Sequence, residues 1–472
     1  MNSRAIKFIK NFSYTITSNF LSLLISTLII LIVPKIIGVE EYGYWQLYLF
    51  YSSYIGFLHL GWNDGIYLRY GGIEYNKLDK RTLNNQFYML VIFQILILIA
   101  GFLLLNQLDI DPNRNIIFKL TLICMVLVNV GIMLQYILQC TNRIKEFALL
   151  NISDRFMYVV LLILFMLLGV RDFKIMIYAD LAGKLLSLLI GIYFCKDIVL
   201  FPGGKFEFQI NETWKNITIG IKLMLSNIAS MLIVGVVRLG IENHWSVEVF
   251  GKVSLTLSIS NLMMVFINAV GLIMFPILRR TDKNKLSNIY QTMRDFLMVL
   301  MFATLILYYP LKEILTIWLP EYADGLVYMA ILFPISIYEG KMSLLVNTYL
   351  KTLREEKAML RINSLIFTLS ILFTLGSTMY FNSLNLAVVS IIVLIASRCI
   401  LAELYLSRKL NIDISKDIVY EIILTIFFIL NAWILNSLLG LLSYILIYII
   451  YIMIKKNDIK NATENIKLLL KK

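Results

Sequence analysis

Charged side chains, histidines and cysteines are scarce in this chain of 472 residues. Asp, Glu, Lys and Arg make up 15% of the sequence and hydrophobic residues 59%, whereas a soluble domain averages about 25% charged residues. This composition excludes an ordinary soluble globular protein. The two histidines, His59 and His244, have no ligand partners at metal-binding spacing, so the sequence predicts no metal site.

The four cysteines are Cys124, Cys140, Cys195 and Cys399. They form no Cys-x-x-Cys pair and none falls in a predicted outer loop, which excludes a zinc site and a disulfide scaffold. We expect them to pack as small apolar side chains among helices. The phosphate-binding pattern Gly-x-x-x-x-Gly-Lys-Ser/Thr is also missing. The chain therefore carries no loop for ATP hydrolysis, and we predict no cofactor.

Long apolar stretches, in contrast, are abundant. An α-helix of about 20 apolar residues crosses the hydrocarbon core of a bilayer, and we place about 14 such spans. They are 12–33, 44–65, 85–105, 117–139, 152–170, 174–195, 216–238, 248–276, 291–310, 322–348, 358–379, 385–406, 418–436 and 438–454. The sequence therefore predicts an all-α integral membrane protein with about 14 transmembrane helices. The gaps between spans are too short for a folded domain outside the membrane.

Basic residues fall in alternate gaps between the spans. By our count, about 31 of the 43 lysines and arginines lie in the set of gaps that includes both chain ends. Positively charged loops stay on the cytoplasmic side, so we predict cytoplasmic termini and an even number of spans. The same spread explains the net charge of +13 without a nucleic-acid partner. The first apolar stretch is too long for a cleavable signal peptide.

The first and seventh spans align without a gap at a shift of 208 residues, and nine of 26 positions are identical between 18–43 and 226–251. The identical polar residues of the two spans are Ser18, Asn19 and Ser22 against Ser226, Asn227 and Ser230. We infer a duplication whose halves share one membrane orientation. The duplication predicts an N-terminal lobe of six spans (1–198) and a C-terminal lobe of six (199–412). Two extra spans (413–455) and a basic cytoplasmic tail (456–472) follow.

Ionisable and amide side chains interrupt the apolar spans. Each ionisable group costs roughly 2.5–3.5 kcal/mol on insertion scales, so such residues normally face the bundle interior or a water-filled cavity. Asp180 and Lys184 are four residues apart and can pair on one helix face. Our candidates for a substrate cavity are Ser18, Asn19, Asp64, Arg69, Asp180, Lys184, Lys222, Asn227, Asn261, Glu339, Lys341 and Arg398. For the Ser and Asn residues, the alternative is close packing between helices.

The first 70 residues carry a pattern that resembles a known family. It consists of the polar first span, Pro34-Lys35-Ile36-Ile37-Gly38, Glu41-Tyr42-Gly43-Tyr44-Trp45, Gly61-Trp62-Asn63-Asp64-Gly65 and Arg69-Tyr70. This pattern resembles the Wzx-type polysaccharide flippases. They are the polysaccharide transporter branch of the multidrug/oligosaccharidyl-lipid/polysaccharide exporter superfamily. Over the rest of the chain, the resemblance rests on length, span count and the duplication.

The resemblance implies a bacterial inner-membrane protein that is not an enzyme. It would move undecaprenyl-diphosphate-linked oligosaccharide repeat units from the inner to the outer leaflet for O-antigen, capsule or exopolysaccharide assembly. The resemblance also implies alternating access of two lobes around a central, often cationic cavity. It further implies a polysaccharide polymerase and a chain-length regulator as partners. The acidic residues Asp180, Glu339 and Glu403 depart from a strongly basic cavity. Coupling to a proton or a sodium ion stays open, with Asp64, Asp180 and Glu339 as candidate carriers.

Three other functions stay open. One is an ion-coupled multidrug exporter of the same superfamily, which the last two spans and the cations inside the spans disfavour. The second is a membrane-embedded polysaccharide polymerase or glycosyltransferase, which the lack of a substantial outer loop disfavours. The third is a flippase for peptidoglycan precursors with the same fold.

Overall fold

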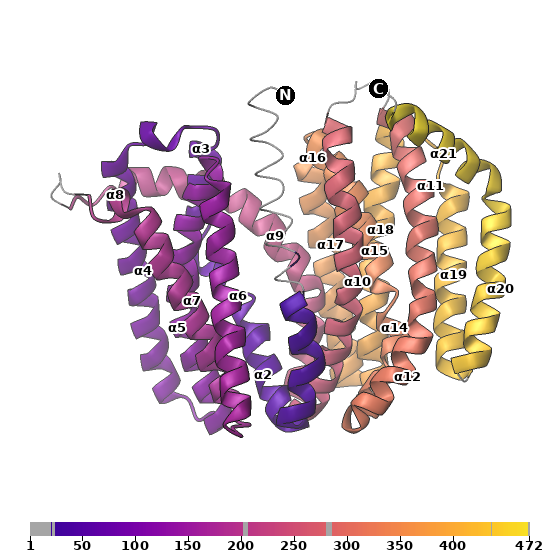
Figure 1. Ribbon diagram of the computed structural model, residues 1–472, viewed down its shortest axis with the longest axis horizontal. Coiled ribbons are helices and arrows are strands. Elements are labelled where there is room, and N and C mark those ends of the chain that lie inside the picture. The colour runs from indigo at the N-terminus through magenta and orange to yellow at the C-terminus, as the bar shows by residue number, and fades with distance from the viewer. Residues whose placement is uncertain (1–19, 21–23, 202–205, 280–285, 436, 471–472) are drawn as a thin grey trace. The chain divides into compact units, whose positions relative to one another are not determined.

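Helices account for every regular element of the structure, a computed structural model that describes residues 20, 24–201, 206–279, 286–435 and 437–470 (Figure 1). Within these ranges there is no β-strand. In the described part of the chain, eleven helical stretches are long and apolar enough to cross a membrane, and they match predicted spans 3–7 and 9–14. Helix α10 (Val247–Arg279) matches the eighth span, and a shorter apolar helix, Leu24–Ile37, overlaps the first. The predicted all-α membrane fold is thus confirmed.

The chain packs as two compact units, residues 1–228 and 229–472. The helices of the first unit are α2 (Val39–Ser52), α3 (Trp62–Tyr70), α4 (Lys80–Gln107), α5 (Pro112–Cys140), α6 (Ile144–Leu167), α7 (Phe173–Phe194) and α8 (Lys196–Val199). Helix α9 (Ile210–His244) runs from the first unit into the second. The predicted lobe limits near 198 and 412 follow from the duplication and stay a prediction.

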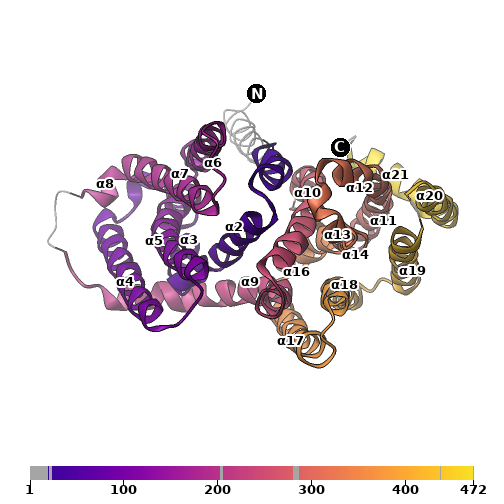
Figure 2. The same ribbon diagram turned by 90° about the horizontal axis from the view of Figure 1, so that it is seen from below.

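Helix α5 is the central helix of the first unit, where it packs against α2, α3, α4 and α7 (Figure 2). Its buried side chains, among them Met133, Leu134 and Ile137, form a core with Leu83 and Leu90 of α4. The four cysteines are buried, which agrees with their predicted packing among helices.

The second unit contains α10, α11 (Leu286–Thr304), α12 (Tyr308–Trp318), α17 (Glu356–Leu375), α18 (Leu384–Leu410), α19 (Ser415–Ile434), α20 (Ser437–Ile454) and α21 (Lys456–Leu470). A broken segment between α12 and α17 consists of α13 (Ala323–Leu326), α14 (Met329–Leu332), α15 (Ile335–Lys341), a π-helical turn (Met342–Val346) and α16 (Asn347–Thr352). Helix α15 packs against α10, α11 and α18. The tenth predicted span, 322–348, is therefore not one regular helix.

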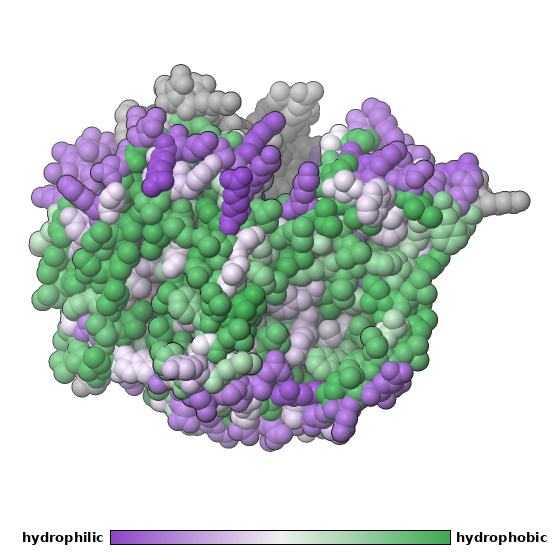
Figure 3. Space-filling view, turned by 180° about the vertical axis from the view of Figure 1, so that it is seen from behind, coloured by the Kyte–Doolittle hydropathy of each residue, from purple (hydrophilic) through white to green (hydrophobic). Residues whose placement is uncertain are grey.

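Side-chain caps mark where several spans begin. The carboxylate of Asp79 accepts a hydrogen bond from the Thr82 amide at the start of α4, and that of Asp111 accepts one from the Arg114 amide at the start of α5. Such caps satisfy amide groups that the first turn leaves without a partner. Between the caps, large apolar side chains such as Leu103 and Leu446 are exposed on the helix surfaces. In each unit, the face seen in Figure 3 is hydrophobic over the middle of the helices and hydrophilic at their ends.

The second predicted span, 44–65, is wrong as a continuous helix. Helix α2 ends at Ser52, a 3-10 turn covers Ile55–His59, and α3 begins at Trp62. Leu60 and Gly61 between them have φ angles of 55° and 80°, a left-handed backbone that ends a right-handed helix. The break lets α3 pack closely on α9. A Cβ atom at Gly65 would lie 1.9 Å from the carbonyl oxygen of Asn216, so this position accepts only glycine.

Candidate functional site

Asp180 and Lys184 form the predicted ion pair on α7. The Lys184 Nζ lies 2.5 Å from the Asp180 Oδ1, and the Tyr48 hydroxyl of α2 donates a hydrogen bond of 2.6 Å to the Asp180 Oδ2. Asp180 is buried, whereas 19% of the Lys184 side chain is exposed. Both carboxylate oxygens therefore have donors, as a buried carboxylate requires. No local sequence pattern indicates Tyr48 as the partner of Asp180, because this tyrosine lies 132 positions away in an apolar stretch.

Two features of the fold hold this group in place. Helices α6 and α7 approach so closely that a Cβ atom at Gly183 would lie 2.5 Å from the carbonyl oxygen of Asp154. The ring of Tyr48 stacks on Trp45 at 5.5 Å, and Trp45 stacks on Tyr158 at 5.9 Å. These stacked rings hold the Tyr48 side chain of α2 in place, so that its hydroxyl points at Asp180.

Asp64 and Arg69, grouped in the sequence by one motif, take part in two different contacts. Asp64 is buried in the first turn of α3, and its Oδ2 lies 3.7 Å from the His59 Nε2. The His59 Nδ1 accepts a hydrogen bond of 3.0 Å from the Gly61 amide, so the neutral ring carries its proton on Nε2, toward Asp64. Arg69, at the other end of α3, donates to Asn216 and Glu212 of α9 at 2.5 and 2.7 Å.

The other predicted cavity residues of the first half of the chain and of α10 are not brought together by these contacts. Lys222 and Asn227 on α9 and Asn261 on α10 have exposed side chains. Ser18 and Asn19 lie outside the described residues. Lys184 and Lys222 belong to the first unit and Arg398 to the second, so a single cavity lined by the three cations stays a prediction.

Arg398 and Glu339 form an ion pair inside the second unit. The Arg398 Nη2 donates to the Glu339 Oε2 at 2.6 Å, and the Nη1 donates to the hydroxyl of Ser230 at 2.7 Å. Only 4% of the Arg398 side chain is exposed, against 29% for Glu339. The buried Nε of Arg398 has no hydrogen-bond partner among the residues that the structure describes. From the sequence, Ser230 was identified only as part of the duplicated polar triplet, whereas in the structure its hydroxyl accepts a hydrogen bond from Arg398.

Lys341 stands two residues after Glu339, and its surroundings are different. Its Nζ lies 2.5 Å from Glu403 of α18 and 2.6 Å from Glu421 of α19. The Lys341 side chain is completely buried. Because two carboxylates already neutralise it away from solvent, we do not include Lys341 among the substrate-binding cations.

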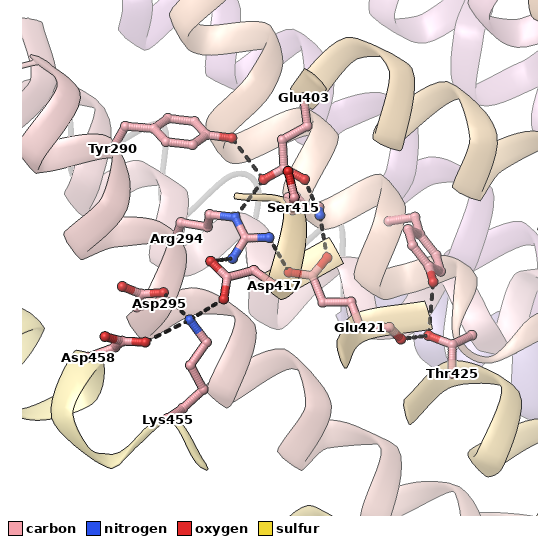
Figure 4. Close-up of polar contacts among 12 residues, drawn as sticks. Tyr290, Arg294, Asp295, Glu403, Ser415, Asp417, Glu421, Thr425, Lys455 and Asp458 are labelled. Atoms are coloured by element: carbon pink, nitrogen blue, oxygen red, sulfur yellow. Dashed lines mark hydrogen bonds and ion pairs between the residues drawn. The ribbon is translucent and has the colours of Figure 1, made fainter. Parts of the chain in front are cut away.

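Arg294 of α11 completes a buried charge cluster, which we define as Arg294, Lys341, Glu403 and Glu421. Figure 4 shows Arg294 between Glu403 and Glu421. The Arg294 Nε donates to Glu403 at 2.7 Å and its Nη2 donates to Glu421 at 2.5 Å. Two cations and two anions thus balance, and every member is at most 1% exposed. Arg294 lies within the ninth predicted span, in the third turn of α11, and is buried against α18 and α19. It was not among the candidate site residues predicted from the sequence.

The charge cluster continues toward the C-terminal helix. The Arg294 Nη1 lies 3.2 Å from Asp417, and Asp417 lies 2.5 Å from the Lys455 Nζ (Figure 4). Lys455, at the junction of α20 and α21, also pairs with Asp295 at 3.1 Å and Asp458 at 3.0 Å. Burial alone lowers the pKa of the Lys455 ammonium, but these carboxylates outweigh it and raise that pKa above its usual value. A hydrophilic pocket of about 580 Å³ lies beside Lys455 between α11, α19 and α21.

Comparison with known proteins places the fold. No family model and no curated protein matches the sequence. Among solved structures, the lipid II flippase MurJ in an inward closed conformation aligns with a TM-score of 0.64 and 14% identity, over 95% of this chain and 99% of that chain. A mutant of the MATE transporter VcmN from Vibrio cholerae aligns with a TM-score of 0.51 and 14% identity, over 83% of this chain and 97% of that chain. The protein therefore is a multi-pass membrane protein with the fold of these transporters.

Proposed function

We propose that this protein is a flippase that moves an undecaprenyl-diphosphate-linked oligosaccharide from the inner to the outer leaflet of the bacterial plasma membrane. The observation that carries the proposal is Arg398, a cation buried inside a span with one N–H group left without a partner among the described residues. The fold, which a lipid II flippase shares, supports a lipid-linked substrate. The N-terminal motif supports polysaccharide repeat units as the cargo.

The chemistry of the substrate fits this site. A diphosphate cannot cross hydrocarbon without groups that replace its hydration, and a guanidinium offers two parallel N–H donors to a phosphate. A membrane potential that is negative inside favours outward movement of an anion by about 2.3 kcal/mol per charge per 100 mV. Transport by alternating access then needs no ATP-hydrolysing loop.

A multidrug exporter for cationic compounds is less well supported. Such a protein needs carboxylates that are free to bind a cation. Here Asp180 is neutralised by Lys184, Glu339 by Arg398, and Glu403 by Lys341 and Arg294. These three acidic groups thus have internal cations, whereas the Arg398 Nε has no hydrogen-bond partner among the described residues.

The proposal is tested with Arg398→Ala in a strain that depends on this gene for its surface polymer. We expect fully assembled lipid-linked units to accumulate on the cytoplasmic leaflet, with normal amounts of protein in the membrane and no surface polymer. Arg398→Lys should retain more activity than Ala if a point charge suffices, and no more than Ala if the guanidinium geometry is needed. The control is Arg408→Ala, an exposed arginine in the last turn of the same helix.

Two other results would contradict the proposal. If the Arg398→Ala strain accumulated lipid-linked repeat units on the outer leaflet without polymerising them, the protein would be a polymerase. Loss of drug resistance with unchanged surface polymer would identify a drug exporter.

A further inference from the structure

We propose that Glu339 is an exchangeable counter-ion, which the anionic group of the substrate displaces from Arg398, while Lys341 holds α15 on α18 during the exchange. This inference rests on the function proposed above. It assigns different roles to two charged residues that are adjacent in the sequence and were grouped together as cavity residues.

The nitrogen atoms of Arg398 show where an anion would bind. The Nε and Nη2 groups of a guanidinium point their N–H bonds the same way and form the edge that receives a carboxylate or phosphate in a bidentate manner. On Arg398, Glu339 occupies the Nη2 half of this edge, and the buried Nε half has no hydrogen-bond partner among the described residues. A phosphate group can use both halves only if Glu339 leaves. The third nitrogen, Nη1, donates to Ser230 and lies outside this edge.

Arg294 provides the contrast within the same unit. Its Nε donates to Glu403, its Nη2 donates to Glu421, and its Nη1 pairs with Asp417. All three nitrogens are therefore occupied, and the carboxylates come from two other helices. Arg294 is a structural cation, whereas the Nε of Arg398 has no partner within the described ranges.

Glu339 is also the partner that can leave most readily. Its side chain is 29% exposed, so its carboxylate can be hydrated after it leaves Arg398. Glu403, the equivalent partner of Lys341, is completely buried and accepts hydrogen bonds from Lys341, Arg294 and Tyr290. Moving Glu403 would leave unpaired charges without water, which is costly.

Helix α15 is held on two sides. Residues two apart in a helix point in nearly opposite directions, and accordingly Glu339 and Lys341 reach different partners. Helix α15 has only seven residues and runs directly into a π-helical turn. Such turns are frequent at functional sites. When Glu339 releases Arg398, the pairs of Lys341 with Glu403 and Glu421 remain and keep α15 in place.

The test measures binding of farnesyl diphosphate and of inorganic pyrophosphate to the purified full-length protein in lipid nanodiscs. We expect Glu339→Gln to bind farnesyl diphosphate about tenfold more tightly than the wild type, because a charge-assisted hydrogen bond no longer competes for Arg398. Arg398→Gln should abolish binding. The control is Glu355→Gln, which removes a carboxylate paired with Lys409 outside the spans, and its affinity should equal that of the wild type.

Each remaining outcome is informative. An affinity of Glu339→Gln equal to or below the wild type would overturn the exchange, because Glu339 would then orient Arg398 rather than compete for it. Glu339→Ala provides the same comparison if the glutamine variant does not fold. Binding that does not depend on Arg398 would instead overturn the assignment of Arg398 in the proposed function. Tighter binding of farnesyl diphosphate than of pyrophosphate supports a lipid-linked ligand, and the reverse order contradicts it.

Discussion

Glu339 and Lys341 stand two residues apart on α15 and form ion pairs of opposite polarity with the same helix, α18. The carboxylate of Glu339 pairs with Arg398, and the ammonium of Lys341 pairs with Glu403. In the first pair Glu339 is partly exposed and the Arg398 Nε lacks a partner among the residues described, whereas the second pair lies in a completely buried cluster. Helix α15 thus connects a group suited to bind an anion with a group suited to hold helices together.

The buried charge cluster predicts a large and specific loss of stability. Lys341→Met should lower the free energy of unfolding by about 3–5 kcal/mol, because it leaves buried carboxylates without one of their cations. The double variant Lys341→Met/Glu421→Gln should lose less than the sum of the single variants, since Arg294 and Glu403 still balance. Thermal unfolding in detergent measures both effects. Equal losses in the double variant and in the sum would show that the charges are not coupled.

The glycines between α3 and α9 give a second prediction. Gly65→Ala should destabilise the first unit by about 1–3 kcal/mol or more, because its Cβ atom would overlap the Asn216 carbonyl oxygen and force the helices apart. Gly131→Ala on α5 is the matched control, since a Cβ atom there meets no atom within 4 Å. Thermal unfolding should show a lower midpoint for the first variant only. A midpoint for Gly65→Ala equal to that of the control would contradict the close approach.

Accessibility to water distinguishes the candidate cations. Cysteines at Lys184, Lys222 and Arg398, in a background without the four native cysteines, should react with a water-soluble thiol reagent if they line the predicted cavity. A cysteine at Lys341 should stay unreactive, because this position is completely buried. Labelling is followed by mass shift in membrane vesicles. Protection of all four positions in active protein would place the first three in dry helix packing.

The membrane orientation is tested with reporter fusions. Fusions after Lys80, Lys285 and Lys357 should report a cytoplasmic location, because these positions lie in the positively charged set of gaps. Fusions near Asp111 and Glu321 should report an external location. Opposite results at two or more of these sites would overturn the predicted orientation, including the cytoplasmic placement of both termini.

Local properties of the sequence determined the membrane spans and one ion pair. A span needs only enough consecutive apolar residues to cover the hydrocarbon, and the four-residue separation of Asp180 and Lys184 puts both on one helix face. Both features depend on neighbouring residues alone, and the structure contains the helices and this pair. The break in the second span also involves neighbours, but hydropathy does not report the left-handed backbone at Leu60 and Gly61.

Tertiary structure alone decided which charges meet. Ser230 and Arg398 are separated by 168 positions and Lys341 and Glu421 by 80, so no local pattern connects them. The sequence therefore presented Glu339, Lys341 and Arg398 as equivalent polar interruptions of apolar helices. Packing of α15 against α18, together with Glu421 of α19, gave Lys341 two buried carboxylates, whereas the Arg398 Nε has no hydrogen-bond partner in the described part of the chain. The difference arises because the cost of a buried charge depends on the partners that distant helices bring to it.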